Sequence, residues 1–276
     1  MLPVPYGAGS ALLFLSFQFF GETCYLEVHK VSIRFTVADH KELVTFKGIL
    51  ESVEGLLPLD FIIGVYRHMK SNPQGFETTW LQRSLVTAKE IAEAQDLNVN
   101  SQGILLASIM LMESGRRFVG VDPQEGSAAF AVTFINEVAP KYFSDDEIKT
   151  ICNCLRYNRQ RFRRSVDGAF VLMVSEVSIL TNVRYKDIDN AVVEYVRENK
   201  CGDVDSSGTC QIEGWHESLA NGFNELYGHN GSIWTQLTKT TQEAFSDHIL
   251  TFKRLAGNQT VIKSIVTQNY QRIFSK

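Results

Sequence analysis

The chain has 276 residues, a formal net charge of −4 and a pI near 5.9. Hydrophobic residues make up 44% and charged residues 21% of it, which is typical of a folded globular protein and argues against an intrinsically disordered chain. The slightly acidic balance provides no general attraction to nucleic acid or to acidic membranes. The length suits one large domain or two modest ones.

Five cysteines occur at irregular spacing, and their number is odd, unlike the cysteines of a secreted disulfide scaffold. We therefore expect a reducing compartment and a cytoplasmic protein. Cys152 and Cys154 lie inside a helical pattern, where their side chains point in different directions. We interpret them as ordinary core residues rather than as zinc ligands or a redox pair.

The first apolar run, ALLFLSFQFF at residues 11–20, is shorter than the roughly 20 residues of a membrane-spanning helix. It also lacks the basic segment and the small-residue cleavage site of a signal peptide. We predict a buried strand or helix here, and the alternative is a leader or a segment that contacts a partner. The alternation of apolar and polar residues over 23–36 then predicts a strand or hairpin.

From residue 39 onward the apolar residues recur at helical spacing. The sequence SNPQG at 71–75 breaks this pattern and marks a predicted domain boundary. Ser144 and Glu147 have the spacing of a capping box, and Asn100 with Ser101 is expected to cap another helix. The predicted helices cover residues 39–53, 60–69, 80–95, 104–112, 126–138, 148–157, 170–180, 188–199, 215–227, 234–255 and 261–274.

Four phrases between residues 80 and 195 together resemble, in their order and spacing, core helices of the HD superfamily of metal-dependent phosphohydrolases. They are LQRSLVTAKEIAEAQDL at 81–97, LLASIMLMESGRRF at 105–118, EGSAAFAVTFINEVAPKYFSDDEIKTICNCLRYN at 125–158 and FVLMVSEVSIL at 170–180. The helical pattern and this resemblance together predict a mainly α fold with three parts. These are a small N-terminal α+β segment (1–75), a degenerate HD-like helical domain (76–200) and a C-terminal helical extension (201–276). An unrelated helical bundle is the alternative.

The chemistry of that family depends on divalent metals held by His and Asp side chains, which activate a water molecule and neutralise phosphate. None of the six histidines of this chain falls at a matching position. The matching positions hold Gln82, Met112, Glu113, Asn158 and Ser175 or Glu176. The resemblance therefore implies a degenerate pocket with no catalytic residue and no metal cofactor.

An enzymatic alternative rests on three carboxylates of the same segment, Glu113, Glu125 and Glu176. Together they would form an oxygen-rich site for magnesium or manganese. The chain would then be a divergent phosphohydrolase that acts on nucleotides or phosphate esters.

The densest basic segment of the chain is RYNRQRFRR at 156–164. Guanidinium groups bind phosphate and carboxylate in a forked geometry, and the two aromatic residues can stack on a base. We predict a site for a phosphorylated ligand, a nucleotide or an acidic protein partner; the alternative is a solvated turn paired with residues 145–147. Its candidate ligand-binding residues are Arg156, Arg159, Arg161, Arg163 and Arg164.

A weaker metal candidate lies in the loop DVDSSGTCQIEG at 203–214. Asp203, Asp205 and Ser207 stand at positions 1, 3 and 5 of an EF-hand calcium loop, with Gly208 at position 6. Gly214 occupies position 12, where the bidentate glutamate should be, so a plain turn is the competing interpretation. A calcium-responsive protein is accordingly a second alternative function.

The sequence thus predicts a non-catalytic regulatory or signalling protein that binds a ligand or a partner, and it leaves the oligomeric state open.

Overall fold

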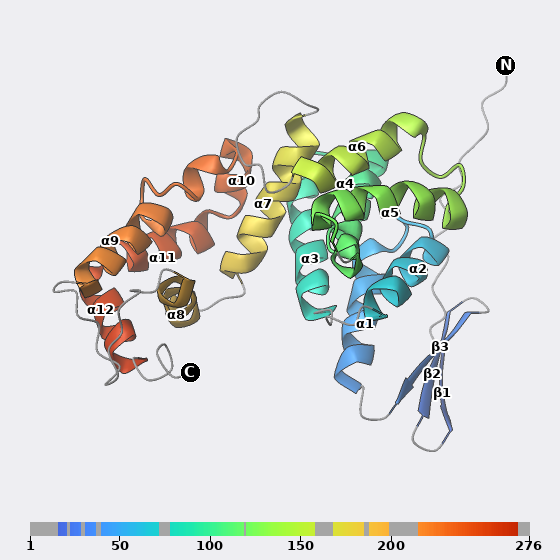
Figure 1. The fold of residues 1–276 in the computed structure, drawn as a ribbon, viewed down its shortest axis with the longest axis horizontal. Coiled ribbons are helices and arrows are strands. Elements are labelled where there is room, and N and C mark those ends of the chain that lie inside the picture. The colour runs from blue at the N-terminus through green and yellow to red at the C-terminus, as the bar shows by residue number, and fades with distance from the viewer. Residues whose placement is uncertain are drawn as a thin grey trace.

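The structure is a computed structural model, and it describes residues 16–20, 23–28, 31–36, 40–71, 78–118, 120–157, 168–184, 188–198 and 215–269. The three shortest of these ranges are strands, and the others are dominated by helices (Figure 1). The mainly α architecture predicted from the sequence is therefore confirmed. No helix in the described ranges combines the length and the apolar character that crossing a membrane requires.

The N-terminal part is a small antiparallel sheet of three strands in the order β1-β2-β3. The strands are β1 (Ser16–Phe20), β2 (Thr23–Val28) and β3 (Val31–Thr36). The pair β2–β3 forms a hairpin within the segment whose alternation predicts strands, and β1 is the second half of the apolar run. Residues 11–15 of that run lie outside the described residues. The sheet leads directly into α1, which β3 contacts.

Seven helices build the central part of the molecule, and α4 lies among them, in contact with α2, α3, α6 and α7. Every residue from Gly103 to Leu111 on α4 is buried, as expected for a helix that is apolar on all sides. A short 3-10 helix, η2 (Ser114–Arg117), follows α4. The helices are α1 (His40–Val53), α2 (Leu59–Lys70), α3 (Thr78–Ala94), α4 (Val99–Leu111), α5 (Pro123–Val138), α6 (Asp145–Tyr157) and α7 (Gly168–Arg184).

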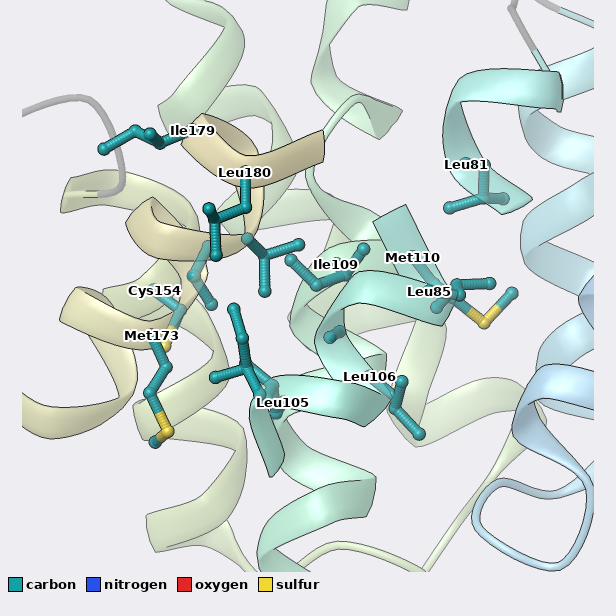
Figure 2. Packing of buried hydrophobic residues seen from close by; sticks show 14 of the residues in the cluster. Leu81, Leu85, Leu105, Leu106, Ile109, Met110, Cys154, Met173, Ile179 and Leu180 are labelled. Atoms are coloured by element: carbon teal, nitrogen blue, oxygen red, sulfur yellow. The ribbon is translucent and has the colours of Figure 1, made fainter. Parts of the chain in front are cut away.

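The centre of the core is formed by α4 packing against α7 and α3. Figure 2 shows Leu105 and Ile109 of α4 approaching Leu180 of α7, while Leu85 of α3 lies on the other side of α4. The helices α1 and α2 belong to the same hydrophobic cluster. The first two helices therefore share one core with the helices that follow residue 75.

The C-terminal helices form a second group beside α7 (Figure 1). The group is held together by an aromatic cluster of Phe223, Tyr227, Trp234 and Phe252. Its members are α8 (Ile188–Glu198), α9 (Trp215–Tyr227), η3 (Trp234–Gln236), α10 (Lys239–Ala244), α11 (Ser246–Ala256) and α12 (Gln259–Gln268).

The prediction of one continuous helix over 234–255 is wrong, because the chain breaks twice in this range. Thr238 has extended backbone angles and caps α10, its hydroxyl oxygen accepting from the Thr241 N–H at 3.3 Å. Phe245 then separates α10 from α11 with a φ of −109°. A threonine cap satisfies amide groups that would otherwise lack partners at a helix start, so it stabilises the break.

The predicted capping box is confirmed at α6. The Ser144 N–H donates to Glu147 at 2.7 Å, and the Glu147 N–H faces the Ser144 hydroxyl at 3.4 Å. The cap of α4 is Asn98, which accepts from the Ser101 N–H at 2.9 Å, so the expected cap at Asn100 is wrong. Asn100 instead donates to Glu147, and this hydrogen bond with those from Ser144 lowers the pKa of Glu147.

The two cysteines of α6 are buried in the core and are not joined in a disulfide, which confirms their interpretation as core residues. The Cys152 thiol donates to the carbonyl of Ala128 on α5 at 3.5 Å. Burial raises the pKa of Cys152, so the thiol stays protonated at neutral pH.

Replacing Leu105 by Ala should lower the free energy of unfolding by about 2–5 kcal/mol, because it leaves a cavity at a fully buried position. Urea denaturation followed by circular dichroism measures the change. Val99→Ala at the exposed start of the same helix is the control and should change stability by less than about 0.5 kcal/mol. Equal effects at the two positions would contradict a central place for α4.

Candidate functional site

Gln82 and Met112, two of the positions at which the resemblance places metal ligands, are engaged in contacts between helices. Gln82 on α3 lies against α1, where a Cβ on Gly48 would come within 2.0 Å of the Gln82 Nε2 atom. Met112, at the end of α4, accepts through its sulfur from the Ser178 hydroxyl of α7 at 3.7 Å. Asn158 lies outside the described residues. Two of these positions thus serve as packing contacts.

The turn that follows α4 is held tightly against the start of α5. The Gly115 N–H donates to the Ser127 hydroxyl oxygen at 2.8 Å, and the Ser127 hydroxyl donates to the Met112 carbonyl at 3.0 Å. A Cβ on Gly115 would lie 2.1 Å from the Pro123 carbonyl oxygen, so the two backbones approach as closely as glycine allows. Glu113 stands at the entrance to this turn, and its Oε2 atom is buried.

One histidine reaches the same turn from α2, which the sequence patterns do not indicate. His68 stacks on Phe130 of α5 with ring centroids 3.8 Å apart, and its Nε2 atom lies 3.1 Å from the Ser114 carbonyl oxygen. The contact joins residues 46 positions apart, so helical periodicity gives no signal for it. His68 therefore ties α2 to η2 through a contact separate from that of Ser127.

The most distinctive polar group is Glu176 on α7, whose side chain has no solvent exposure. Its Oε1 atom accepts a hydrogen bond from the Thr238 N–H, and Oε2 accepts from the Thr241 hydroxyl at 2.7 Å. Both partners lie at the start of α10, where backbone N–H groups carry partial positive charge. The carboxylate therefore connects the central helices to the C-terminal group.

A chain of hydrogen bonds extends this contact to α3. The Thr238 hydroxyl donates to Thr241 Oγ1 at 2.9 Å, and the Gln95 side-chain amide donates to Thr238 Oγ1 at 3.0 Å. Burial raises the pKa of Glu176, and the hydrogen bonds from Thr238 and Thr241 oppose that rise in part. We call Glu176, Thr238, Thr241 and Gln95 the Glu176 network.

The sequence patterns miss the two hydrogen-bond partners of Glu176 because they lie far from it along the chain. Thr238 and Thr241 follow it by 62 and 65 positions. The one local sign of a helix start at this point is Thr238, a residue type that often caps helices. The apolar residues on both sides of it recur at helical spacing, so the sequence does not show that the helix is interrupted. Pattern reading favours the longer helix there.

The structure describes the arginine-rich segment only at its first two residues, Arg156 and Tyr157. Arg156 on α6 donates through Nε to Glu125 on α5 at 3.0 Å. Its partner is therefore on α5, and not among the acidic residues at 145–147. The other candidate arginines, Arg159, Arg161, Arg163 and Arg164, lie outside the described residues. So does the calcium-loop candidate with Asp203, Asp205 and Ser207.

The three carboxylates of the alternative metal site each have their own surroundings. Glu125 pairs with Arg156, Glu176 binds the start of α10, and Glu113 lies at the turn after α4. Within the described ranges, no three His, Cys, Asp or Glu side chains gather in a group suited to a metal ion.

Comparison of the chain with protein-family models, with curated proteins and with solved structures gives no significant match. The functional interpretation consequently depends on the residues and their contacts.

Replacing Glu176 by Gln should make the free energy of unfolding less dependent on pH. With a raised pKa, the folded chain keeps the Glu176 proton at pH values where the unfolded chain has released it. Wild-type stability therefore falls as the pH rises from the ordinary Glu value of 4.5 through the raised pKa. The glutamine side chain of the variant cannot titrate, so the variant gains stability relative to wild type across that window.

Urea denaturation of both proteins at pH 4 to 8 measures this difference. Glu93→Gln on the exposed side of α3 is the control for the loss of one carboxylate. Parallel stability profiles for wild type and Glu176→Gln would contradict a raised pKa at this position.

Thr241→Val removes the hydroxyl that donates to Glu176 while keeping the shape of the side chain. We expect a loss of about 1–3 kcal/mol, because a fully buried carboxylate oxygen loses its donor. The loss should shrink in a Glu176→Gln background, with a coupling energy above about 0.5 kcal/mol in a double-mutant cycle. Thr240→Val at the exposed neighbouring position is the control. Additive losses would show that the two side chains do not interact.

Proposed function

We propose that the protein is a non-catalytic regulatory or ligand-binding protein built on a degenerate HD-like helical core. The observation that carries this proposal is the state of Glu176, one of the two positions, with Ser175, that the resemblance offers for the family's last metal ligand. Its two carboxylate oxygens accept hydrogen bonds from Thr238 and Thr241. A side chain used in this way supports the docking of α10, because its lone pairs are directed to groups of the same chain.

The other positions of the resemblance support the same interpretation. Gln82 packs over Gly48, and Met112 contacts Ser178. A thioether is a poor ligand for a hard divalent cation, and a side-chain amide is a weaker ligand than imidazole or carboxylate. The scaffold of helices is thus used for packing at positions where the family uses metal chemistry.

For the ligand, the proposal rests on the arginine-rich segment at 156–164. Arginine forks bind phosphate and carboxylate with two parallel hydrogen bonds. Arg156 anchors the start of the segment to Glu125 at the first turn of α5. We infer that a phosphorylated ligand or an acidic partner is bound by the remaining four arginines.

Metal analysis tests the absence of catalysis. We expect the purified full chain to hold less than about 0.1 equivalent of manganese, iron or magnesium, since tight sites need several converging ligands. With added Mg²⁺ or Mn²⁺ it should not hydrolyse nucleoside triphosphates or p-nitrophenyl phosphate. Glu113→Ala should behave like wild type, as should the control Glu93→Ala.

One tightly bound metal per chain that is lost on Glu113→Ala, together with metal-dependent hydrolysis, would overturn the proposal and favour the divergent phosphohydrolase. Calcium bound at one equivalent and lost on Asp203→Ala would instead favour the calcium-responsive alternative.

A further inference from the structure

A groove of about 870 Å³ opens on the C-terminal helices, where the end of α9, the end of α11 and the start of α12 meet. Its volume lies in the range of small-molecule sites, roughly 300–1,000 Å³. It shares no residue with the Glu176 network and none with the arginine-rich segment. The groove is therefore a separate candidate for a binding site.

The charge of the groove is positive. Lys253 and Arg254 line it from the last turn of α11, and neither forms an ion pair with a side chain in the described ranges. Glu225 supplies the one carboxylate among the lining residues. Two cations beside one anion favour a ligand that brings negative charge.

The remaining wall of the groove consists largely of side-chain amides. Asn224, Asn230, Asn258 and Gln259 line it from α9, from the turn after it and from the start of α12. Amide side chains carry both donors and an acceptor, which matches hydroxyl groups that also donate and accept. Gln259 uses one of its N–H donors on the Asn221 side-chain oxygen and keeps the other groups for a ligand. Asn258 uses its oxygen to cap the Val261 N–H at 3.2 Å, so its NH₂ group is the part left to donate to a ligand.

The lining residues include no Phe, Tyr or Trp. Nucleobases are usually held by stacking on such rings, with a gain of about 1–3 kcal/mol for each base. His229 is the only ring among the residues that line the groove. The composition accordingly favours a hydroxylated ligand over a nucleotide.

A glycine keeps the groove open. Gly257 follows α11 with a φ of −71°, which any residue adopts, and a Cβ there would meet its nearest heavy atom at 3.4 Å. The backbone at this position therefore tolerates a larger side chain, which would project beside Lys253 and Asn224. Gly257 provides a way to fill the groove without changing its charge.

We propose that this groove binds a small phosphorylated polyol, such as a sugar phosphate. Lys253 and Arg254 hold the phosphate group, and the amide side chains bind the hydroxyl groups. The groove is separate from the arginine-rich segment, so this inference goes beyond the proposed function and adds a second binding site to the chain.

Isothermal calorimetry on the full chain tests the proposal, with glucose 6-phosphate as the probe. We expect glucose 6-phosphate to bind more tightly than either glucose or inorganic phosphate, because each of these supplies only part of the contacts. AMP should bind more weakly than the sugar phosphate. Raising the salt from about 50 to about 300 mM should weaken binding, since exposed cations are screened.

Two variants locate the ligand. Lys253→Gln with Arg254→Gln should weaken binding by about tenfold or more, because charge-assisted hydrogen bonds to the phosphate are lost. Gly257→Leu should weaken it to a similar extent by filling the groove. Lys149→Gln at an exposed site on α6 is the matched control for loss of charge and should bind as wild type does. Circular dichroism checks that each variant is folded.

Three results would overturn the inference: glucose 6-phosphate does not bind, it binds no more tightly than glucose, or its binding is unchanged in both groove variants. Tighter binding of AMP would do the same. If Arg161→Ala with Arg163→Ala abolishes binding while the groove variants retain it, the phosphate lies at the arginine-rich segment. That result would exclude the groove as the binding site and would leave the proposed function standing. Metal-dependent hydrolysis by the purified protein would have the opposite effect, because it contradicts the proposed function and leaves the groove untouched.

Discussion

Burial of one carboxylate connects the two groups of helices in this protein. Glu176 sits inside α7 with no exposure to solvent, and it reaches across to the first turn of α10. Burying a carboxyl group is costly, and the cost here is reduced because two hydrogen-bond donors at the start of α10 face it. The position of α10 beside α7 and α3 depends on that compensation.

The contact also accounts for the break of the C-terminal chain before α10. A continuous helix would have its backbone N–H groups bonded internally and would offer none to Glu176. The break before α10 releases the Thr238 N–H as a donor and places the Thr241 hydroxyl beside it. Trp234, just before the break, packs against Tyr227 and Phe252. The same break therefore gives Thr238 the geometry of a helix cap and supplies the hydrogen-bond donors for Glu176.

Much of the helical framework could be predicted from the sequence, because helices with one apolar face have a clear period. The buried stretch Gly103–Leu111 of α4 and the capping box of Ser144 and Glu147 are examples of signals contained within a few residues. The break at Thr238 could not be predicted, since its cause is a residue 62 positions away. The contact of His68 with Ser114 is hidden for the same reason. Candidate positions such as Gln82 could be chosen from a resemblance, but periodicity does not show what a side chain touches.

The tight turn at Gly115 limits how this protein can change over evolution. Any side chain at this position would strike the backbone of α5, at the Pro123 carbonyl and the Ser127 amide nitrogen. A lineage that replaced Gly115 would have to move α5 away from the end of α4. Selection for the fold alone should therefore keep glycine at this position.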